Sequence, residues 1–212
     1  MIPNGDLLRR HARDPKTTNW APFIESRQWP EVEPNGLFVV AAHPDDELLG
    51  LGATMHRMVK SGKSVRVLCL SCGDDPIRSQ EFHAGLEDLG VTDRHIADLP
   101  DGDLLSHLDA AEELIRDLHD GRTLATTWAE DGHPDHLAAA RASARVDTPR
   151  YFPIWMWQWA VPGDDVFASI SKLSVGETDL AAKLRALECH ASQLGRIVPK
   201  SLVNTLEHEW LL

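Results

Sequence analysis

Two short stretches of the chain bring together residue types that bind metals. Ala42-His43-Pro44-Asp45-Asp46-Glu47 combines one histidine with three carboxylates, and His133-Pro134-Asp135-His136 combines two histidines with one carboxylate. Imidazole and carboxylate groups are suitable zinc ligands, and a catalytic zinc site keeps three protein ligands and an open position for water. These residue types and spacings therefore indicate one shared metal site that activates water.

Each stretch follows an apolar run that predicts a buried strand, and each precedes a predicted helix. The first run, Leu37–Ala42, follows an Asn35-Gly36 turn, and the second is Leu124–Trp128. Pro44 and Pro134 suit the first turn of a helix, where a missing N–H leaves no partner unsatisfied. Both stretches are therefore expected at carboxyl ends of strands, where open α/β sheets bind their ligands.

Single residues in these stretches also have ordinary structural explanations. Asp45 or Asp46 suits a helix N-cap, and His133 suits a loop histidine bonded to the backbone. Adjacent aspartates at a helix start cannot point the same way, so one is expected to bind the metal and the other to face its water. Capping does not explain His43, Asp46 and His136 together, and the metal interpretation is favoured.

The pair of stretches resembles the PIG-L/LmbE-like de-N-acetylases, zinc hydrolases that remove acetyl groups from N-acetylglucosaminyl compounds. The resemblance covers residues 36–195, nearly the whole chain. The matching segments besides the two motifs are Arg78-Ser79-Gln80-Glu81, Leu89-Gly90-Val91, Leu99-Pro100-Asp101-Gly102, Asp131-Gly132, Lys183 and His190-Ala191-Ser192-Gln193.

The resemblance implies that His43, Asp46 and His136 bind Zn²⁺, and Fe²⁺ suits the same ligands. It also implies that Asp45 is the general base that takes a proton from the attacking water. Zinc supplies a nucleophile at neutral pH because it lowers the pKa of bound water to about 7.

The resemblance further implies that His133 acts as electrophile or general acid, with Asp135 orienting it and keeping it protonated. Arg78 is expected to contact substrate hydroxyls, or alternatively to pair with a neighbouring surface carboxylate. Trp128 is expected to line the pocket. Asp131 stands where several sugar-cleaving relatives carry a tyrosine, which makes it a third substrate-binding candidate. Because of this difference, the identity of the substrate, a glycan or an acylated secondary metabolite, stays open.

Strands and helices alternate along most of the chain. This order predicts an α/β, Rossmann-like three-layer fold with a mostly parallel central sheet and helices on both faces. One domain over residues 1–212 is expected, with a proline-rich irregular N-terminal extension over residues 1–35. The expected strands are 37–42, 64–70, 95–98 and 123–128, and the expected helices are 46–60, 78–89, 105–120 and 134–146.

The pattern changes after Pro149. Strands are expected over 150–159 and 166–172, followed by a helix over 176–194 with leucines at helical spacing. Trp155, Trp157 and Trp159 alternate, so an extended strand would place them on one face. Such a face suits a substrate-stacking platform or, as we favour, a buried sheet face or a subunit interface.

Composition narrows the functional classes. The chain has 21 basic and 33 acidic residues, a net charge of −12, and no Lys/Arg cluster, which argues against nucleic acid or an anionic membrane as partner. No apolar stretch approaches the roughly 18 residues of a membrane span, and the N-terminus lacks an apolar signal core. Three cysteines suit the reduced thiols of a cytoplasmic protein.

The expected activity is zinc-dependent removal of an acetyl or other acyl group from an N-acetylglucosaminyl-type or related N-acylated small molecule. Two alternatives stay open: a metal-dependent hydratase or lyase on the same fold, and a non-catalytic binding module. The Trp-rich segment also resembles deacetylase-like proteins associated with methyltransferase partners, and the oligomeric state is left open, a homo-oligomer included.

Overall fold

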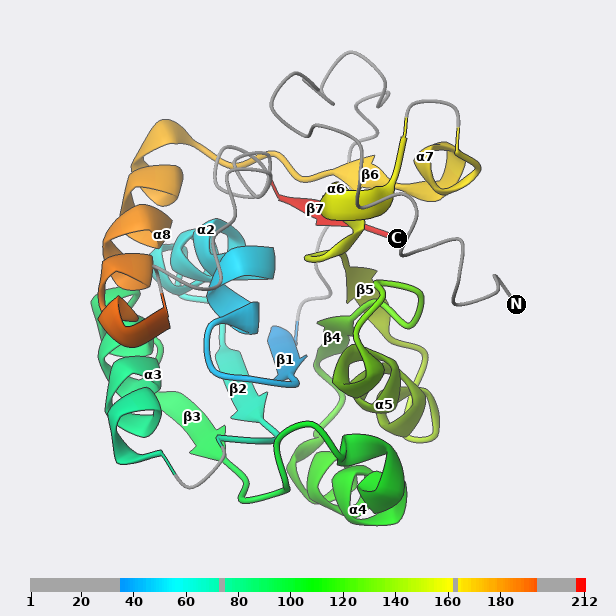
Figure 1. The fold of residues 1–212 in the computed structure, drawn as a ribbon. Coiled ribbons are helices and arrows are strands. Elements are labelled where there is room, and N and C mark those ends of the chain that lie inside the picture. The colour runs from blue at the N-terminus through cyan, green and yellow to red at the C-terminus, as the bar shows by residue number, and fades with distance from the viewer. Residues whose placement is uncertain (1–34, 73–74, 162–163, 194–208) are drawn as a thin grey trace.

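Figure 1 shows the computed structural model of the chain, which describes residues 35–72, 75–161, 164–193 and 209–212. The irregular extension expected over residues 1–35 falls outside these ranges except for its last residue. Within them, five parallel strands form the main sheet in the order β3-β2-β1-β4-β5. These strands are β1 (Leu37–Ala41), β2 (Val65–Cys69), β3 (Asp93–Ile96), β4 (Thr123–Thr127) and β5 (Arg150–Phe152).

The central strand β1 is buried on both faces, as its continuous apolar sequence predicts. Leu37 and Val39 pack into one hydrophobic cluster, while Phe38 and Val40 pack into another on the opposite side. This alternation follows from the period of two in a strand. The sheet therefore separates two cores, and each core needs its own layer of helices.

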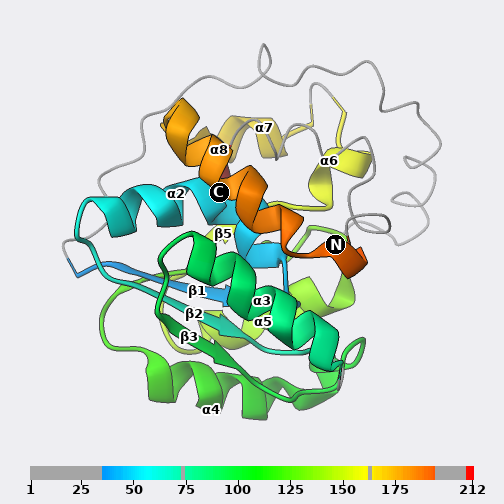
Figure 2. The same cartoon turned by 90° about the vertical axis from the view of Figure 1, so that its left-hand side faces the viewer.

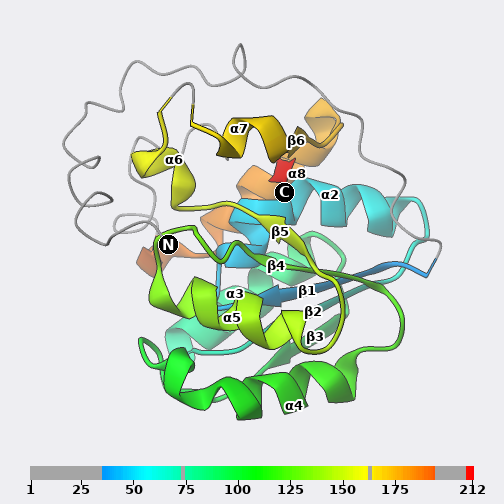
Figure 3. The same cartoon turned by 90° about the vertical axis from the view of Figure 1, so that its right-hand side faces the viewer.

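Helices cover both faces of the sheet, as Figures 2 and 3 show from two sides. The layers are α2 (Asp46–Lys60), α3 (Pro76–Asp88) and α8 (Glu177–Glu188) on one face, and the 3-10 turn η3 (Leu104–His107), α4 (Leu108–Leu118) and α5 (Pro134–Ala144) on the other. The predicted three-layer α/β fold is confirmed. In the described part of the chain, no helix combines the length and apolar character that crossing a membrane requires.

The segment after residue 149 differs from the expected pattern. Strand β5 ends at Phe152, and the helical turns α6 (Met156–Trp159) and α7 (Val166–Ser169) replace most of the expected strands. The cause is tertiary: the Asp131 carboxylate accepts the backbone N–H groups of Ile154, at 3.0 Å, and Met156, at 2.8 Å. These bonds turn the chain away from the sheet. Two short antiparallel strands follow, β6 (Ser171–Lys172) and β7 (Trp210–Leu211).

Because α6 is helical, the three alternating tryptophans do not share a face. Trp157 is buried in the core. Trp159 is also buried and stacks on Trp128, with ring centroids 6.1 Å apart. Trp155 is half-buried, and its ring centroid lies 6.1 Å from that of His133. The expectation of one shared face is wrong, whereas the burial of Trp157 and Trp159 agrees with the interpretation that was favoured.

Helix α8 is shorter than the helix expected over residues 176–194. It begins at Glu177 and ends at Glu188. Beyond it, the backbone N–H and the hydroxyl of Ser192 donate to the Glu81 carboxylate on α3, at 2.8 and 2.6 Å. Glu81 thus ties the chain that leaves α8 to the neighbouring helix.

Candidate metal and catalytic site

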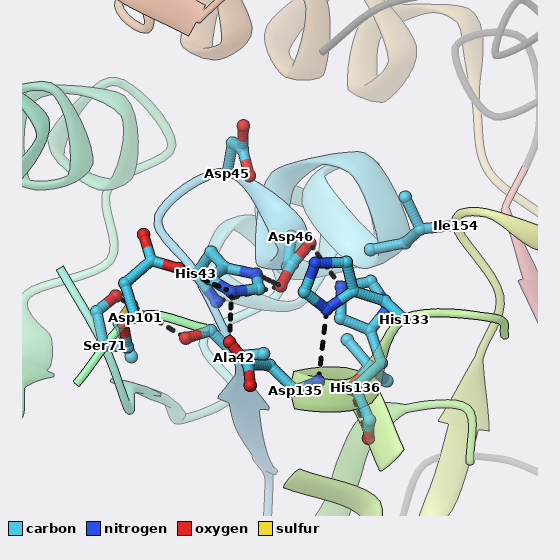
Figure 4. Close-up of polar contacts among 12 residues, drawn as sticks. Ala42, His43, Asp45, Asp46, Ser71, Asp101, His133, Asp135, His136 and Ile154 are labelled. Atoms are coloured by element: carbon cyan, nitrogen blue, oxygen red, sulfur yellow. Dashed lines mark hydrogen bonds and ion pairs between the residues drawn. The ribbon is translucent and has the colours of Figure 1, made fainter. Parts of the chain in front are cut away.

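The two histidine-containing stretches meet at the carboxyl ends of β1 and β4 (Figure 4). From β1 the chain adds β2 and then β3 next to one edge of β1. It then returns and adds β4 next to the other edge of β1. Neighbouring strands whose connections leave in opposite directions open a crevice at their carboxyl ends, which is where α/β sheets bind ligands. The fold therefore brings together residues 43–47 and 131–136.

The Asp46 carboxylate connects two imidazoles. Its Oδ2 lies 3.4 Å from His43 Nδ1 and accepts the His43 backbone N–H at 2.9 Å. Its Oδ1 lies 3.3 Å from His136 Nε2. Asp46 and His136 are buried, and the His43 side chain is 11% exposed. One carboxylate and two imidazole nitrogens thus face one another with little access for water.

Each of these histidines has a second carboxylate on its other nitrogen. His43 Nε2 lies 3.0 Å from Asp135 Oδ2, and His136 Nδ1 lies 2.6 Å from Asp131 Oδ2. A carboxylate on the far nitrogen fixes the tautomer and the ring orientation of a metal-binding histidine. The nitrogens left for a metal are therefore His43 Nδ1 and His136 Nε2, which are the two that face Asp46.

Asp131 does not fit the expected role in substrate binding. The residue has no exposed surface, and its carboxylate is occupied by His136 and by the backbone N–H groups of Ile154 and Met156. Its carbonyl oxygen accepts the indole N–H of Trp159 at 2.9 Å. The structure therefore places Asp131 behind His136, where it orients the imidazole.

The expected relation between Asp135 and His133 also needs correction. The Asp135 carboxylate faces His43 and accepts the backbone N–H groups of Gly102 and Leu104. Only the backbone N–H of Asp135 reaches His133, donating to Nδ1 at 3.1 Å. Burial, followed by the nearby His136 and His43, lowers the pKa of His133. Asp135 thus orients His133 through the main chain and favours the neutral imidazole with its proton on Nε2.

The donor set fits a divalent cation. The buried Nε2 of His136 has no hydrogen-bond partner among the described residues. One ligand atom from each of His43, His133 and His136 also lies within 4.8 Å of the others. His133 belongs to this cluster by distance, but its Nδ1 already accepts a backbone N–H, whereas Asp46 contacts both other histidines. Two imidazoles and one carboxylate form a donor set that zinc accepts.

Asp45 has an unusual backbone. It is buried, and its φ of 110° is the one positive value for a non-glycine residue among the described residues. Such strain costs about 1–3 kcal/mol and persists only where the surroundings enforce it. The Asp45 N–H donates to Glu47 Oε2 at 3.2 Å, and its carbonyl accepts the Leu49 N–H at 2.9 Å. These bonds hold a conformation that turns the Asp45 side chain away from Asp46 in Figure 4.

Charges within the site shift several pKa values. Burial, and then the neighbouring Asp46, raise the pKa of Asp45 well above its ordinary range. Burial lowers the pKa of His43, but hydrogen bonds to Asp101, Asp135 and Asp46 outweigh it and raise the value to about 12. Burial likewise opposes the charged form of His136, yet Asp46 and Asp131 raise its pKa to about 9. Without a metal, the two histidines thus carry the cationic charge of the site.

These shifts predict how the stability of the metal-free protein depends on pH. The pKa of His136 is about 9 in the folded state against an ordinary 6.5. A raised pKa contributes stability that is complete below pH 6.5 and is lost as the pH rises through 9. The melting temperature in excess EDTA should therefore fall across this window, and His136→Gln should remove part of this slope. A wild-type melting temperature that stays flat or rises over the same pH range would contradict the prediction.

Asp131→Asn is expected to weaken metal binding by about 10- to 100-fold, the usual cost of losing a partner of a ligating histidine. The new amide accepts the Ile154 and Met156 N–H groups with one atom and presents an NH₂ group to His136 Nδ1. That donor favours the tautomer with the proton on Nε2, the nitrogen that faces Asp46. Chelator competition would measure the change, with Asp109→Asn at an exposed position as control. Unchanged affinity would show that Asp131 does not set the tautomer.

Arg78 lies beside the site rather than on a distant surface. Its guanidinium donates to Asp101 Oδ2 at 2.7 Å, and Asp101 Oδ1 lies 3.3 Å from His43 Nε2. Asp101 was not among the predicted site residues, although the Leu99-Pro100-Asp101-Gly102 tract stood out in the sequence. Trp128 directly follows β4 and is half-buried against Trp159. Of the expected substrate-binding residues, Arg78 and Trp128 thus lie at the carboxyl edge of the sheet.

A family model described as PIG-L, GlcNAc-PI de-N-acetylase, matches residues 38–146. The matched region covers just over half of the chain and includes both histidine-containing stretches.

Individual relatives are more distant. A 1D-myo-inositol 2-acetamido-2-deoxy-alpha-D-glucopyranoside deacetylase from Kineococcus radiotolerans is 27% identical over 162 residues, covering 54% of this chain and 45% of the relative. The chain spans about half the length of the curated relatives it matches.

Solved structures share the fold over most of the chain. The zinc-inhibited form of teicoplanin deacetylase Orf2 superimposes with a TM-score of 0.66 at 17% identity, covering 82% of this chain and 96% of that one. The conserved protein TT1542 from Thermus thermophilus gives a TM-score of 0.61 at 26% identity, covering 80% of this chain and 84% of that one.

Proposed function

Because the chain belongs to the PIG-L family of GlcNAc-PI de-N-acetylases, we propose that it is a metal-dependent hydrolase that removes an acetyl or related acyl group from an N-acetylglucosaminyl-type or similar N-acylated small molecule. The observation that carries the proposal is the convergence of His43, Asp46 and His136 beside the strained, buried Asp45. The deacetylase activity named for the relatives supports the same reaction class.

In this proposal His43 Nδ1, one Asp46 oxygen and His136 Nε2 hold the cation, which is Zn²⁺ or Fe²⁺. Asp135 and Asp131 occupy the far nitrogens of the two histidines and keep the facing nitrogens free of protons. When bound, a divalent cation makes water nucleophilic near neutral pH and polarises the amide carbonyl. The protein supplies orientation, proton transfer and exclusion of bulk water.

Asp45 acts as the general base. A base works best when its pKa approaches the pH at which it operates, and burial beside Asp46 raises the pKa of Asp45 in that direction. After taking a proton from the attacking water, the Asp45 carboxyl delivers it to the amine nitrogen, because that nitrogen leaves only when it is protonated. The strained backbone keeps this carboxylate apart from the ligand Asp46.

His133 acts as a neutral electrophile. Its Nδ1 accepts a backbone N–H, so the imidazole proton sits on Nε2 and is available to the carbonyl oxygen as that atom gains negative charge. This role needs no cationic imidazole, in agreement with the lowered pKa of His133. Positioned hydrogen-bond donors of this kind contribute about 10²–10³-fold to kcat in other acyl-transfer enzymes.

Substrate hydroxyls are bound by Arg78, whose guanidinium is held by Asp101 next to His43. The Arg78 side chain keeps some exposed surface beside this ion pair, so its guanidinium also offers donors for a substrate oxygen. Trp128 lines the same edge of the sheet and supplies an apolar surface for a sugar ring. Asp131 has no part in substrate binding in this proposal, because its carboxylate is fully used.

The test is release of a primary amine by zinc-loaded protein across a panel of N-acetylglucosaminyl compounds, followed by detection of acetate. Amine and acetate in equal amounts support the proposal. A hydratase or lyase on the same fold would change the substrate without releasing amine. A binding module would bind metal and ligand without any product, and either outcome would overturn the hydrolase assignment.

A further inference from the structure

Helix α2 is bent within its second turn. Leu51 has φ −134° and ψ 17°, outside the helical range, although residues 46–60 otherwise form one helix. Such a break leaves backbone groups on either side without partners inside the helix, and in a buried helix these must be satisfied from elsewhere. The short first segment before the bend begins at Asp46 and directly follows Asp45.

A buried ion pair meets the backbone at this bend. Glu209, just before β7, accepts the N–H groups of Ala53, at 2.7 Å, and Thr54, at 2.8 Å, with its two carboxylate oxygens. Lys183, from α8, donates to the carbonyl of Leu49 at 2.7 Å. The Lys183 ammonium lies 3.1 Å from Glu209 Oε1, and both side chains have no exposed surface. The pair thus binds the helix on both sides of Leu51.

Close packing fixes the same bend. A Cβ on Gly50 would overlap the Phe152 ring at the end of β5, so this ring rests directly on the first helical segment. A Cβ on Gly52 would come 3.0 Å from Lys183 Cγ, so the lysine chain crosses the second segment closely. Glycines reduce helix stability by about 1 kcal/mol each relative to alanine, and here they allow two neighbours to approach the backbone on either side of the bend.

From these contacts we infer that the Lys183–Glu209 pair is a positioning device for Asp45 and Asp46. It stabilises the bend in α2 and so sets the direction of the segment that carries both carboxylates into the site. A buried ion pair contributes little net stability compared with apolar residues of the same volume, whereas its hydrogen bonds to the backbone of α2 fix one geometry. The inference rests on the proposed function, since it assigns the pair to the metal ligand and the base.

The experiment compares Lys183→Met and Glu209→Gln with the double variant, all in the full-length protein. Each single variant removes one charge of the buried Lys183–Glu209 pair and keeps the other, so both lose thermal stability. The double variant removes both charges of the pair and is expected to recover stability relative to the singles. Even so, a methionine side chain cannot donate to the Leu49 carbonyl. The N–H groups of Ala53 and Thr54 bind different oxygens of Glu209, and a glutamine amide replaces one of these acceptors with an NH₂ group. We expect kcat and the affinity for Co²⁺, measured by chelator competition, to fall about 10-fold or more in the singles and in the double variant.

A control separates positioning from stability. Ile115→Ala creates a cavity in the core on the other face of the sheet, away from α2, and should lower thermal stability while leaving kcat and Co²⁺ affinity unchanged. Gly52→Ala displaces Lys183 mildly, and is expected to lower Co²⁺ affinity even if the singles do not fold. In the metal-free protein, amide hydrogen exchange at Ala53 and Thr54 should accelerate in every variant of the pair.

The outcomes are distinct. If kcat and Co²⁺ affinity return together with thermal stability in the double variant, or if Gly52→Ala and the singles leave both unchanged, the pair is only structural and the inference is wrong. If the wild-type protein neither binds Co²⁺ nor releases amine, the proposed function fails instead. In that case hydrogen exchange at Ala53 and Thr54 still decides whether the pair maintains the bend.

Discussion

Asp45→Asn is expected to leave metal binding intact and to lower kcat by about 10²- to 10⁴-fold, the range for removal of a general base. The Asp45 carboxylate makes no contact with His43 or His136 comparable to those of Asp46, so the ligand set survives. Asparagine is also among the residues that best tolerate a positive φ, so the strained turn is retained. The loss should therefore fall on proton transfer and not on folding.

Two measurements check this prediction. Metal content after dialysis should match the wild-type protein, and kcat for amine release should fall while KM changes little. Asp117→Asn, at an exposed position on α4, is the matched control. If the variant instead loses its metal and Asp46→Asn keeps it, the roles of the two aspartates are the reverse of those proposed.

His136→Ala is expected to abolish both metal binding and turnover. In the wild-type protein, a ligand at roughly 1,000 times its Kd stabilises the folded state by about 4 kcal/mol, and the variant should lose this response. The metal-free variant should also be less stable, because Asp131 and Asp46 each lose a partner in a buried place.

Thermal melts with excess zinc and with EDTA measure this effect directly. The wild-type protein should melt at a higher temperature with zinc, and His136→Ala should melt at the same temperature in both. His95→Ala, on the edge strand β3, should respond to zinc as the wild-type protein does. A zinc-dependent shift that persists in His136→Ala would place the metal elsewhere.

Much of the fold follows from local sequence. The apolar runs that form β1 and β4, the alternation of strands with helices, and the start of α2 at Asp46 were predicted correctly. The strands could be predicted locally because a strand that is buried on both faces requires consecutive apolar residues. The convergence of residues 43–46 with 133–136 was also predictable, since both stretches end neighbouring parallel strands.

What the sequence did not reveal depends on contacts between distant segments. The direction of the Asp135 side chain toward His43 depends on Gly102 and Leu104. The helical α6 replaces the predicted strand because Asp131 binds its backbone. Alternation of large apolar residues does not distinguish these outcomes, since the deciding hydrogen bonds join residues that are 23 to 92 positions apart.

The placement of the site between β1 and β4 has a consequence for folding. Strands β1, β2 and β3 form one half of the sheet, and β4 and β5 form the other, so that the β1–β4 pairing is the seam between them. Of the proposed ligands, His43 and Asp46 come from the first half and His136 from the second, so neither half alone carries all three. A cation bound at this proposed site would therefore link the two halves across the seam, and its binding energy would make the unfolding of the sheet more cooperative.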